Sequence, residues 1–233
     1  MQKIYKLCGS KNRNFKCRLT RFLAHFAAFL ILANGSLVTT THAQSILDDK
    51  TLLVIGDSLS AGYNLPPGAG FPERLEDFLR GQGHDITVIN AGVSGDTSSG
   101  GRARLGWAIA GMPAGPDLVI IELGGNDALR GIEPTLTRKN LSAMIEELKA
   151  SGTNILLAGM QAPPNMGREY EAEFNALYAD LANQYDIPLY PFFLDGVAAN
   201  PDLNLADGIH PNEAGINVIV TRIAPLVKEL LTE

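Results

Sequence analysis

The sequence DLVIIEL at residues 117–123 is the strongest strand candidate in this chain of 233 residues. Its centre is continuously apolar, whereas a strand with one solvated face alternates apolar and polar residues. A run of this kind is typical of a strand covered on both faces, as in the parallel sheets of α/β proteins. The stretch therefore predicts a central strand with helices packed on either side of it.

Shorter strand candidates lie on both sides of this stretch and alternate with segments that have helical spacing. The strands are expected at residues 51–55, 86–90, 154–158 and 188–192, and the helices at 72–80, 103–110, 134–149, 169–185 and 211–231. This alternation predicts βαβ units, and hence an α/β fold whose parallel five-stranded sheet carries helices on both faces. No internal repeat or linker interrupts the chain after residue 50, so we expect a single domain.

The N-terminal segment has the composition of a secretory signal peptide. The first 47 residues contain no Asp or Glu but hold seven of the 19 Lys and Arg residues. A short apolar run at residues 22–33 follows, and then small residues before a possible cleavage site after Ala43. We expect residues 1–43 to be a signal peptide and residues 44–233 to be the mature domain, in the periplasm or the medium. An uncleaved anchor is the alternative, although a membrane span needs roughly 20 apolar residues.

Cleavage after Ala43 changes the composition of the chain. Cys8 and Cys17 leave with the presequence, which excludes disulfides, thiol catalysis and cysteine metal sites from the mature domain. Without the seven basic residues of the presequence, 12 of the 19 remain against 25 acidic ones, a net charge of −13. Such an acidic protein is poorly suited to nucleic acid or anionic membrane surfaces. We expect neither as a partner, and no stable membrane insertion of the mature chain.

Polar, glycine-rich segments follow several of the expected strands. They occupy residues 56–60, 90–96 and 124–127, and a fourth segment, residues 207–211, precedes the last helix. In open parallel sheets, ligands bind outside the carboxyl ends of the strands. The four segments therefore predict one site at that edge of the sheet.

Ser58 stands in the first of these segments and is the candidate nucleophile. A serine hydroxyl needs a base to take its proton, usually a histidine, and a third group to orient that base. His84 precedes the strand expected at 86–90, at the wrong end of the sheet, and we expect it to be a solvated loop residue. His210 lies at the right end, three residues after Asp207. We predict a triad in which Asp207 binds Nδ1 of His210 and Nε2 faces Ser58.

Acyl transfer also requires hydrogen-bond donors that face the oxyanion of the tetrahedral intermediate. The candidates are the backbone N–H groups of Ser58 and Gly92 and the side-chain amide of Asn126. Asp57 precedes the nucleophile directly, and adjacent residues on a turn usually point apart. We expect Asp57 to bond the loop backbone rather than to serve as the triad acid.

Four motifs of this chain, taken together, resemble the sequence blocks of the SGNH hydrolase, or GDSL esterase, family. They are GDSLS at 56–60, Gly92 in its Asn-Ala-Gly loop, GGND at 124–127, and Asp207-x-x-His210. The residue that names each block is present and in order, and the resemblance covers essentially all of residues 51–231.

The resemblance extends to finer features of the family. Residues 94–98 (SGDTS) and 124–130 (GGNDALR) are most similar to its bacterial thioesterase I, arylesterase and lysophospholipase members. This similarity implies a three-layer, flavodoxin-like sandwich that uses no cofactor and no metal. It also implies hydrolysis of carboxylic esters and thioesters of acyl groups through an acyl-enzyme on Ser58.

Several other features have two interpretations each. Residues 129–131 either flank an acyl pocket, as the resemblance implies, or only connect a strand to a helix. Residues 160–165 are a candidate wall for the acyl group, although proline-rich segments are often simple loops. Asp207 could merely cap a helix that Pro211 is expected to begin. Trp107 is the sole tryptophan, and its helical spacing predicts a core residue rather than a substrate platform.

Other functions compete with a serine esterase. A carbohydrate acetylesterase or an acyltransferase of the same fold would be favoured by a longer chain with sugar-binding aromatic residues. A non-catalytic exported binding protein would keep the fold, but all the chemical residues are present. A nucleotide-binding module would need a Gly-x-Gly-x-x-Gly or P-loop sequence after a strand, and neither follows any expected strand here.

Overall fold

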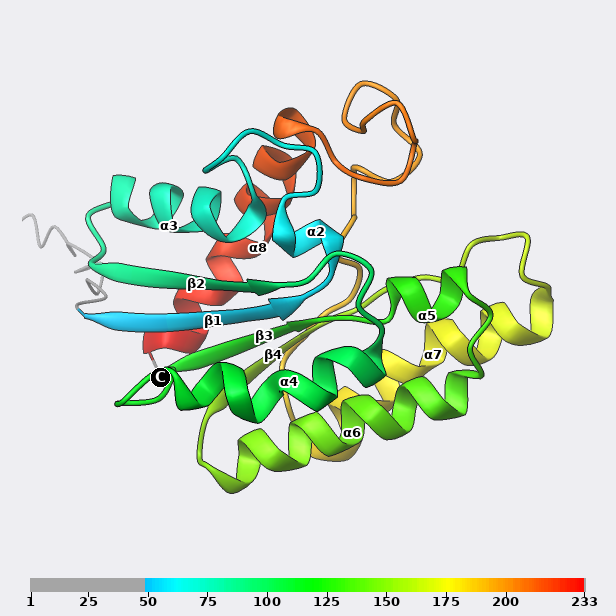
Figure 1. Cartoon of the computed structure of the whole chain (residues 1–233), viewed down its shortest axis with the longest axis horizontal. Helices are drawn as coiled ribbons and strands as arrows, with labels where there is room; N and C mark the ends of the chain where they lie inside the picture. The colour runs from blue at the N-terminus through cyan, green and yellow to red at the C-terminus, as the bar shows by residue number, and fades with distance from the viewer. Residues whose placement is uncertain (1–48, 233) are drawn as a thin grey trace, which may run out of the picture. The chain divides into compact units, whose positions relative to one another are not determined.

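The computed structural model describes residues 49–232, all of which belong to one compact unit, Ser45–Glu233. The expected signal peptide at residues 1–43 lies outside the described residues. The described part contains a five-stranded sheet in the order β2-β1-β3-β4-β5, with every pair of neighbours parallel (Figure 1). The predicted α/β fold with a parallel five-stranded sheet is confirmed.

The strands end level with one another at the edge where the site was predicted. They are β1 (Lys50–Gly56), β2 (Ile86–Gly92), β3 (Leu118–Glu122), β4 (Asn154–Ala158) and β5 (Leu189–Tyr190). In the central part of the sheet, Gly56 pairs with Gly92 on one side and with Glu122 on the other. The loops that follow these three strands therefore start side by side.

Helices cover both faces of the sheet, which gives the predicted three layers. They are α2 (Ser58–Ala61), α3 (Phe71–Gly81), α4 (Ser98–Ala110), α5 (Gly125–Leu129), α6 (Pro134–Ala150), α7 (Arg168–Tyr185) and α8 (Glu213–Thr232). α3 and α8 pack against each other on one face, and α4, α6 and α7 lie on the other (Figure 1). All five residues of β3 are buried between these layers, as its apolar sequence predicts.

Helix α4 begins five residues earlier than the position expected from periodicity. Thr97 caps it by accepting a hydrogen bond from the N–H of Gly100. Gly100 and Gly101 weaken the helical signal of the sequence because glycine has a low helix propensity. Gly101 is nevertheless needed for packing, since a Cβ there would lie 2.2 Å from Cδ1 of Leu123.

Two other predicted elements also differ in the structure. Pro211 does not begin the last helix, because it pairs with Asn204 in an isolated bridge. The side chain of Asn212 accepts a hydrogen bond from the N–H of Gly215 and thereby caps α8 two residues later. Strand β5 contains two residues rather than the five expected at 188–192, since it pairs with β4 alone at the edge of the sheet.

The interpretations of Trp107 and His84 are both wrong. Trp107 is 84% exposed, because α4 turns Leu105 rather than Trp107 toward the sheet. His84 is 3% exposed and belongs to the buried polar residues, not to a solvated loop. The short turn between α3 and β2 holds it against the fold, with its N–H donated to the carbonyl of Leu79.

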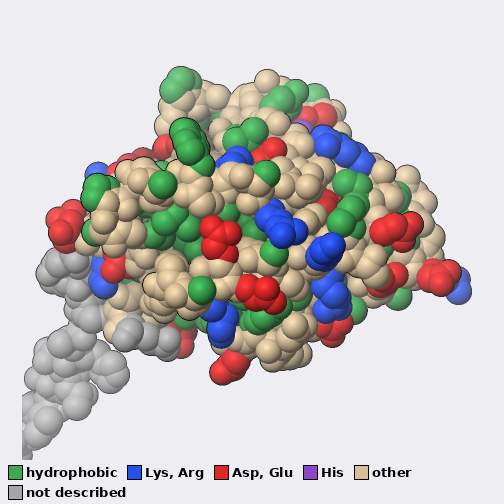
Figure 2. All heavy atoms as spheres, turned by 60° about the horizontal axis from the view of Figure 1, so that its bottom comes forward, with side chains coloured by type: hydrophobic (Ala, Val, Ile, Leu, Met, Phe, Trp, Pro, Cys, Tyr) green, Lys and Arg blue, Asp and Glu red, His purple; other side chains and the backbone are tan. Residues whose placement is uncertain are grey.

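The surface over residues 49–232 carries charges of both signs. The side of the molecule with α4 and α6 comes forward in Figure 2, where basic and acidic side chains are interspersed. None of the helices described is long and apolar enough to cross a membrane.

Candidate active site

The turn after β1 places Ser58 at the carboxyl edge of the sheet. Ser58 is the first residue of the short helix α2, which Asp57 caps by accepting a hydrogen bond from the N–H of Leu59 at 3.0 Å. The turn is tight enough to require glycine at position 56. A Cβ on Gly56 would lie 2.4 Å from Oγ of Ser60 and 2.5 Å from Oε2 of Glu122.

The structure brings Ser58, His210 and Asp207 together in a hydrogen-bonded chain. Nε2 of His210 lies 2.9 Å from Oγ of Ser58, and Nδ1 lies 2.8 Å from Oδ2 of Asp207. The other carboxylate oxygen of Asp207 accepts hydrogen bonds from the N–H groups of His210 and Ile209, both at 3.0 Å. These bonds, led by that of His210, lower the pKa of Asp207 to about 2, so its carboxylate is charged at neutral pH. This is the order of groups required to activate a serine hydroxyl.

Tyr63 contacts both His210 and Ser58, which the sequence did not suggest. Its ring lies against the ring of His210, with centroids 4.4 Å apart and planes tilted by 36°. Its backbone N–H donates to the carbonyl of Ser58 at 3.1 Å. A tyrosine five residues after Ser58 is a weak signal, because only the fold brings His210 next to it.

Ser58, His210 and Asn126 of α5 line a cavity of about 610 Å³. This volume lies within the range typical of small-molecule sites. The rest of its lining is mostly apolar and includes Leu129, Met160, Ala162, Pro163, Pro164, Met166, Phe192, Leu194, Ala198, Ala199 and Ile209. Both loops singled out in the sequence, 129–131 and 160–165, therefore contribute side chains to the cavity wall.

The backbone N–H of Gly92 is already engaged in a hydrogen bond, which argues against its predicted use as an oxyanion donor. Its N–H already donates to Oδ1 of Asn90 at 2.9 Å. Its lack of a side chain serves packing instead, because a Cβ would lie 2.4 Å from the backbone nitrogen of Ala61. The sequence shows a glycine at the end of β2, but it does not show that the adjacent turn occupies the space beside it.

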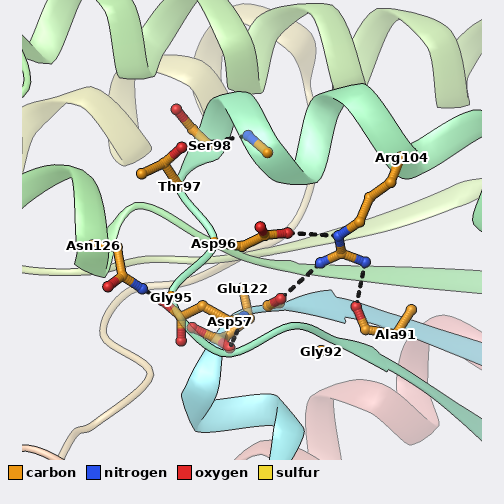
Figure 3. Close-up of polar contacts among 12 residues, drawn as sticks. Asp57, Ala91, Gly92, Gly95, Asp96, Thr97, Ser98, Arg104, Glu122 and Asn126 are labelled. Carbon is orange, nitrogen blue, oxygen red and sulfur yellow. Dashed lines mark hydrogen bonds and ion pairs between the residues drawn. The ribbon is translucent and has the colours of Figure 1, made fainter.

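Gly95, in the loop after β2, is held close to the helix that carries Asn126. Its φ of +85° favours glycine, and its carbonyl accepts a hydrogen bond from Nη2 of Arg130 at 2.8 Å. Arg130 directly follows α5, which begins beside Asn126. Figure 3 shows Gly95 on the loop next to Asp57 and Asn126.

Arg104 anchors the same loop from the other side. Its guanidinium donates to the carboxylate of Asp96 at 2.6 Å and to the carbonyls of Ala91 and Gly56 at 2.5 and 2.8 Å (Figure 3). The guanidinium thereby joins the ends of β1 and β2 to the loop. An arginine within a helix gives no sequence signal for this function.

Two carboxyl groups lie buried behind the serine turn, with Asp57 2% exposed and Glu122 fully buried. Oε2 of Glu122 accepts hydrogen bonds from Oγ of Ser60 at 2.6 Å and from the N–H of Asp57 at 3.3 Å. Burial, and then the negative charge of Asp57, raise the pKa of Glu122 well above its usual range. Burial also raises the pKa of Asp57, to about 6, although bonds from Leu59 and Asn126 oppose the change. In the sequence, Glu122 stands out only as a charged residue at the end of the apolar run of β3.

Within residues 49–232, no three His, Cys, Asp or Glu side chains gather as a metal site would require.

Comparison with known proteins identifies the family. The profile of the GDSL-like Lipase/Acylhydrolase family matches residues 54–217, which include the serine turn, the Asn126 segment and the Asp207-His210 pair. The chain belongs to this family. It is therefore a carboxylic ester hydrolase, in agreement with the names of its relatives.

Two named relatives and one solved structure illustrate the similarity. The chain is 43% identical over 182 residues to "Esterase TesA" of Pseudomonas aeruginosa, covering 78% of this chain and 90% of that protein. It is 43% identical over 162 residues to "Thioesterase 1/protease 1/lysophospholipase L1" of Escherichia coli, covering 70% and 76% of the two. The crystal structure of AlinE4, described as an SGNH-hydrolase family esterase, has a TM-score of 0.67 at 45% identity, over 79% of this chain and 98% of that one.

Proposed function

We propose that the protein hydrolyses carboxylic esters and thioesters of acyl groups through a covalent acyl-enzyme on Ser58. The observation that supports this proposal most directly is the chain of hydrogen bonds from Asp207 through His210 to Ser58. It ends at a cavity with mostly apolar walls, which suits an acyl chain.

The reaction needs two proton transfers in each half. Ser58 Oγ attacks the carbonyl carbon while Nε2 of His210 takes the hydroxyl proton, and Asp207 stabilises the imidazolium that forms. The tetrahedral intermediate collapses as the C–O or C–S bond breaks, and His210 passes the proton to the departing alcohol or thiol. Water then attacks the acyl-enzyme with His210 again as the base, and the carboxylic acid leaves with Ser58 reprotonated.

Three donors are available for the oxyanion in these steps. The N–H of Ser58 and the amide of Asn126 were expected from the sequence, and both residues line the cavity. For the third donor we propose the N–H of Gly95 in place of that of Gly92, which is occupied by Asn90. The N–H of Gly95 donates to no other group of residues 49–232, and Arg130 fixes the neighbouring carbonyl.

The substrate class and location are further parts of the proposal. The names of the relatives, which include "Arylesterase" and "Thioesterase 1/protease 1/lysophospholipase L1", favour acyl esters and thioesters with varied leaving groups. The basic and then apolar N-terminal sequence supports export to the periplasm or the medium.

A panel of p-nitrophenyl esters of increasing chain length, beside an acyl-CoA and a lysophospholipid, tests this function. We expect cleavage without added metal, loss of cleavage in Ser58→Ala, and an unchanged melting temperature in that variant. Cleavage confined to acetylated sugars would favour the carbohydrate esterase instead. Acyl transfer to an added alcohol with little hydrolysis would favour the acyltransferase, and the absence of any turnover would favour a binding protein.

A further inference from the structure

The carboxylate of Asp57 lies directly behind the amide of Asn126 and has no step of its own in the proposed reaction. Oδ2 of Asp57 accepts a hydrogen bond from Nδ2 of Asn126 at 2.9 Å, and Oδ1 accepts one from the N–H of Leu59 at 3.0 Å. Both contacts are made in a nearly solvent-free environment, since Asp57 is 2% exposed. The contact between the two side chains can be followed in Figure 3.

The direction of this hydrogen bond has a chemical consequence. An asparagine amide carries two donor hydrogens on nitrogen and an acceptor oxygen, and a half-turn of the amide exchanges them. An ionised carboxylate can only accept, so it selects the orientation in which Nδ2 of Asn126 faces Asp57. One hydrogen of Nδ2 is then used, and the second remains for a group in the cavity.

We propose that Asp57 is a positioning residue that fixes the Asn126 amide with its second hydrogen toward the oxyanion. This inference rests on the proposed function, because it assigns Asn126 to the oxyanion site. Asp57 acts through Asn126 and makes no contact with the reacting atoms in this account.

The groups around Asp57 are consistent with an ionised carboxylate, which can accept hydrogen bonds, at the pH of the assay. Its pKa of about 6 leaves it ionised at pH 8, with Asn126, Leu59 and the nearby His210 favouring the charged form. Asp127 on α5 opposes that charge. Glu122 on β3 meets Asp57 at its backbone N–H, and its own raised pKa favours the protonated carboxyl, which avoids a second buried charge.

Replacing Asp57 by asparagine should invert the amide in the site. The N–H of Leu59 has a fixed direction in α2 and still requires an acceptor, so it keeps the single oxygen of the new amide. The new NH₂ group then faces Asn126, which must present its own oxygen. The half-turn places an acceptor where the oxyanion needs a donor.

The test is a double-mutant cycle on kcat for a p-nitrophenyl ester at pH 8, with Asp57→Asn, Asn126→Ala and the double variant. We expect Asp57→Asn to lower kcat by about 10²–10³-fold, as for the loss of one oxyanion donor, with little change in KM. We expect the double variant to be no slower than Asn126→Ala, because the two changes disable the same group.

Two further variants separate positioning from a purely structural effect. Asp57→Ala removes the acceptor without adding a donor, so Asn126 retains part of its productive population and kcat should fall less than in Asp57→Asn. A structural effect predicts the opposite order, because alanine removes both hydrogen bonds and leaves a cavity. Glu122→Gln is the matched control: it changes a buried carboxyl of the same cluster to an amide, and Oε1 meets no hydrogen-bonding group of residues 49–232. Its kcat should stay close to that of the parent.

The inference is overturned if Asp57→Asn keeps kcat within a few-fold of the parent, or if the two losses multiply in the double variant. It is also overturned if alanine is worse than asparagine at position 57, or if Glu122→Gln loses as much activity as Asp57→Asn. In each of these cases the parent still cleaves esters through Ser58. A parent without that activity would instead overturn the proposed function and this inference with it.

Discussion

Nε2 of His210 lies 2.9 Å from Oγ of Ser58, although 152 residues separate the two in the chain. The fold explains this contact. Ser58 follows β1, an inner strand of the sheet, and His210 precedes α8, which packs beside α3 on the face above β1 and β2 (Figure 1). The first strand and the last helix therefore bring a nucleophile and a base together.

The bond between Asp207 and Nδ1 of His210 should control the reactivity of Ser58. Asp207→Asn leaves an oxygen for the N–H groups of Ile209 and His210 but removes the charge that stabilises the imidazolium. We expect kcat to fall by up to about 10⁴-fold, as in serine hydrolases whose triad aspartate is changed to asparagine. Steady-state kinetics on a p-nitrophenyl ester measures the loss. A variant with parental kcat would leave Asp207 as a simple turn residue.

The ring of Tyr63 should steady the imidazole of His210. Tyr63→Ala removes the ring that lies against His210, and an aromatic contact of this kind is worth about 0.5–1.5 kcal/mol, which corresponds to about 2–10-fold in kcat/KM. Tyr63→Phe keeps the ring and should keep the activity. Equal losses in both variants would assign the effect to the hydroxyl and contradict this explanation. The side chain is 41% exposed, so neither change should unfold the protein.

Filling the apolar cavity should shorten the preferred acyl chain. Ala198 lines the cavity at an exposed position, where a larger side chain can enter without overpacking the core. In Ala198→Trp we expect the ratio of kcat/KM for the octanoate to that for the acetate ester to fall by about tenfold. The same substitution at Ala103, on the exposed side of α4, is the control and should leave the ratio unchanged. An unchanged ratio in Ala198→Trp would place the acyl chain elsewhere.

The buried charge of Asp57 should make the protein less stable as the pH rises. The pKa of Asp57 is about 6 in the folded protein against 3.8 for an ordinary aspartate, so the folded state holds this proton more tightly. Stability is therefore lost between about pH 4 and pH 6, by an amount of order 3 kcal/mol. The unfolding free energy of Asp57→Asn minus that of the parent should rise over this interval and then level off. Urea titrations from pH 4 to pH 8 measure it, and a pH-independent difference would contradict the shift.

Much of the fold follows from local signals in the sequence. The apolar run within 117–123 forms a fully buried strand over Leu118–Glu122, and the helix over 134–149 and the strand over 154–158 lie where periodicity places them. The differences occur where tertiary contacts outweigh local propensity. Gly101 of α4 is kept because a side chain there would strike Leu123, and Trp107 is exposed because α4 turns Leu105 toward the sheet instead.

The site also has residues that the sequence predicts and residues that only the structure reveals. Strand ends in a parallel sheet meet at one edge, so the sequence was enough to predict that four residues share a site. They are Ser58, Asn126, Asp207 and His210. The sequence could not show which N–H groups are free, and so it favoured Gly92, whose N–H is bonded to Asn90. The supports of the site, such as Arg104 and Tyr63, depend on contacts between distant segments that no spacing reveals.

The most direct test of the central claim is covalent labelling with a fluorophosphonate. If Ser58 is the activated nucleophile, its Oγ displaces fluoride from phosphorus, and peptide mass spectrometry finds one phosphonyl group on Ser58. Labelling and ester cleavage should disappear together in Ser58→Ala, while the melting temperature stays at the parental value. Ester cleavage that persists in Ser58→Ala, or a label on another residue, would contradict the account.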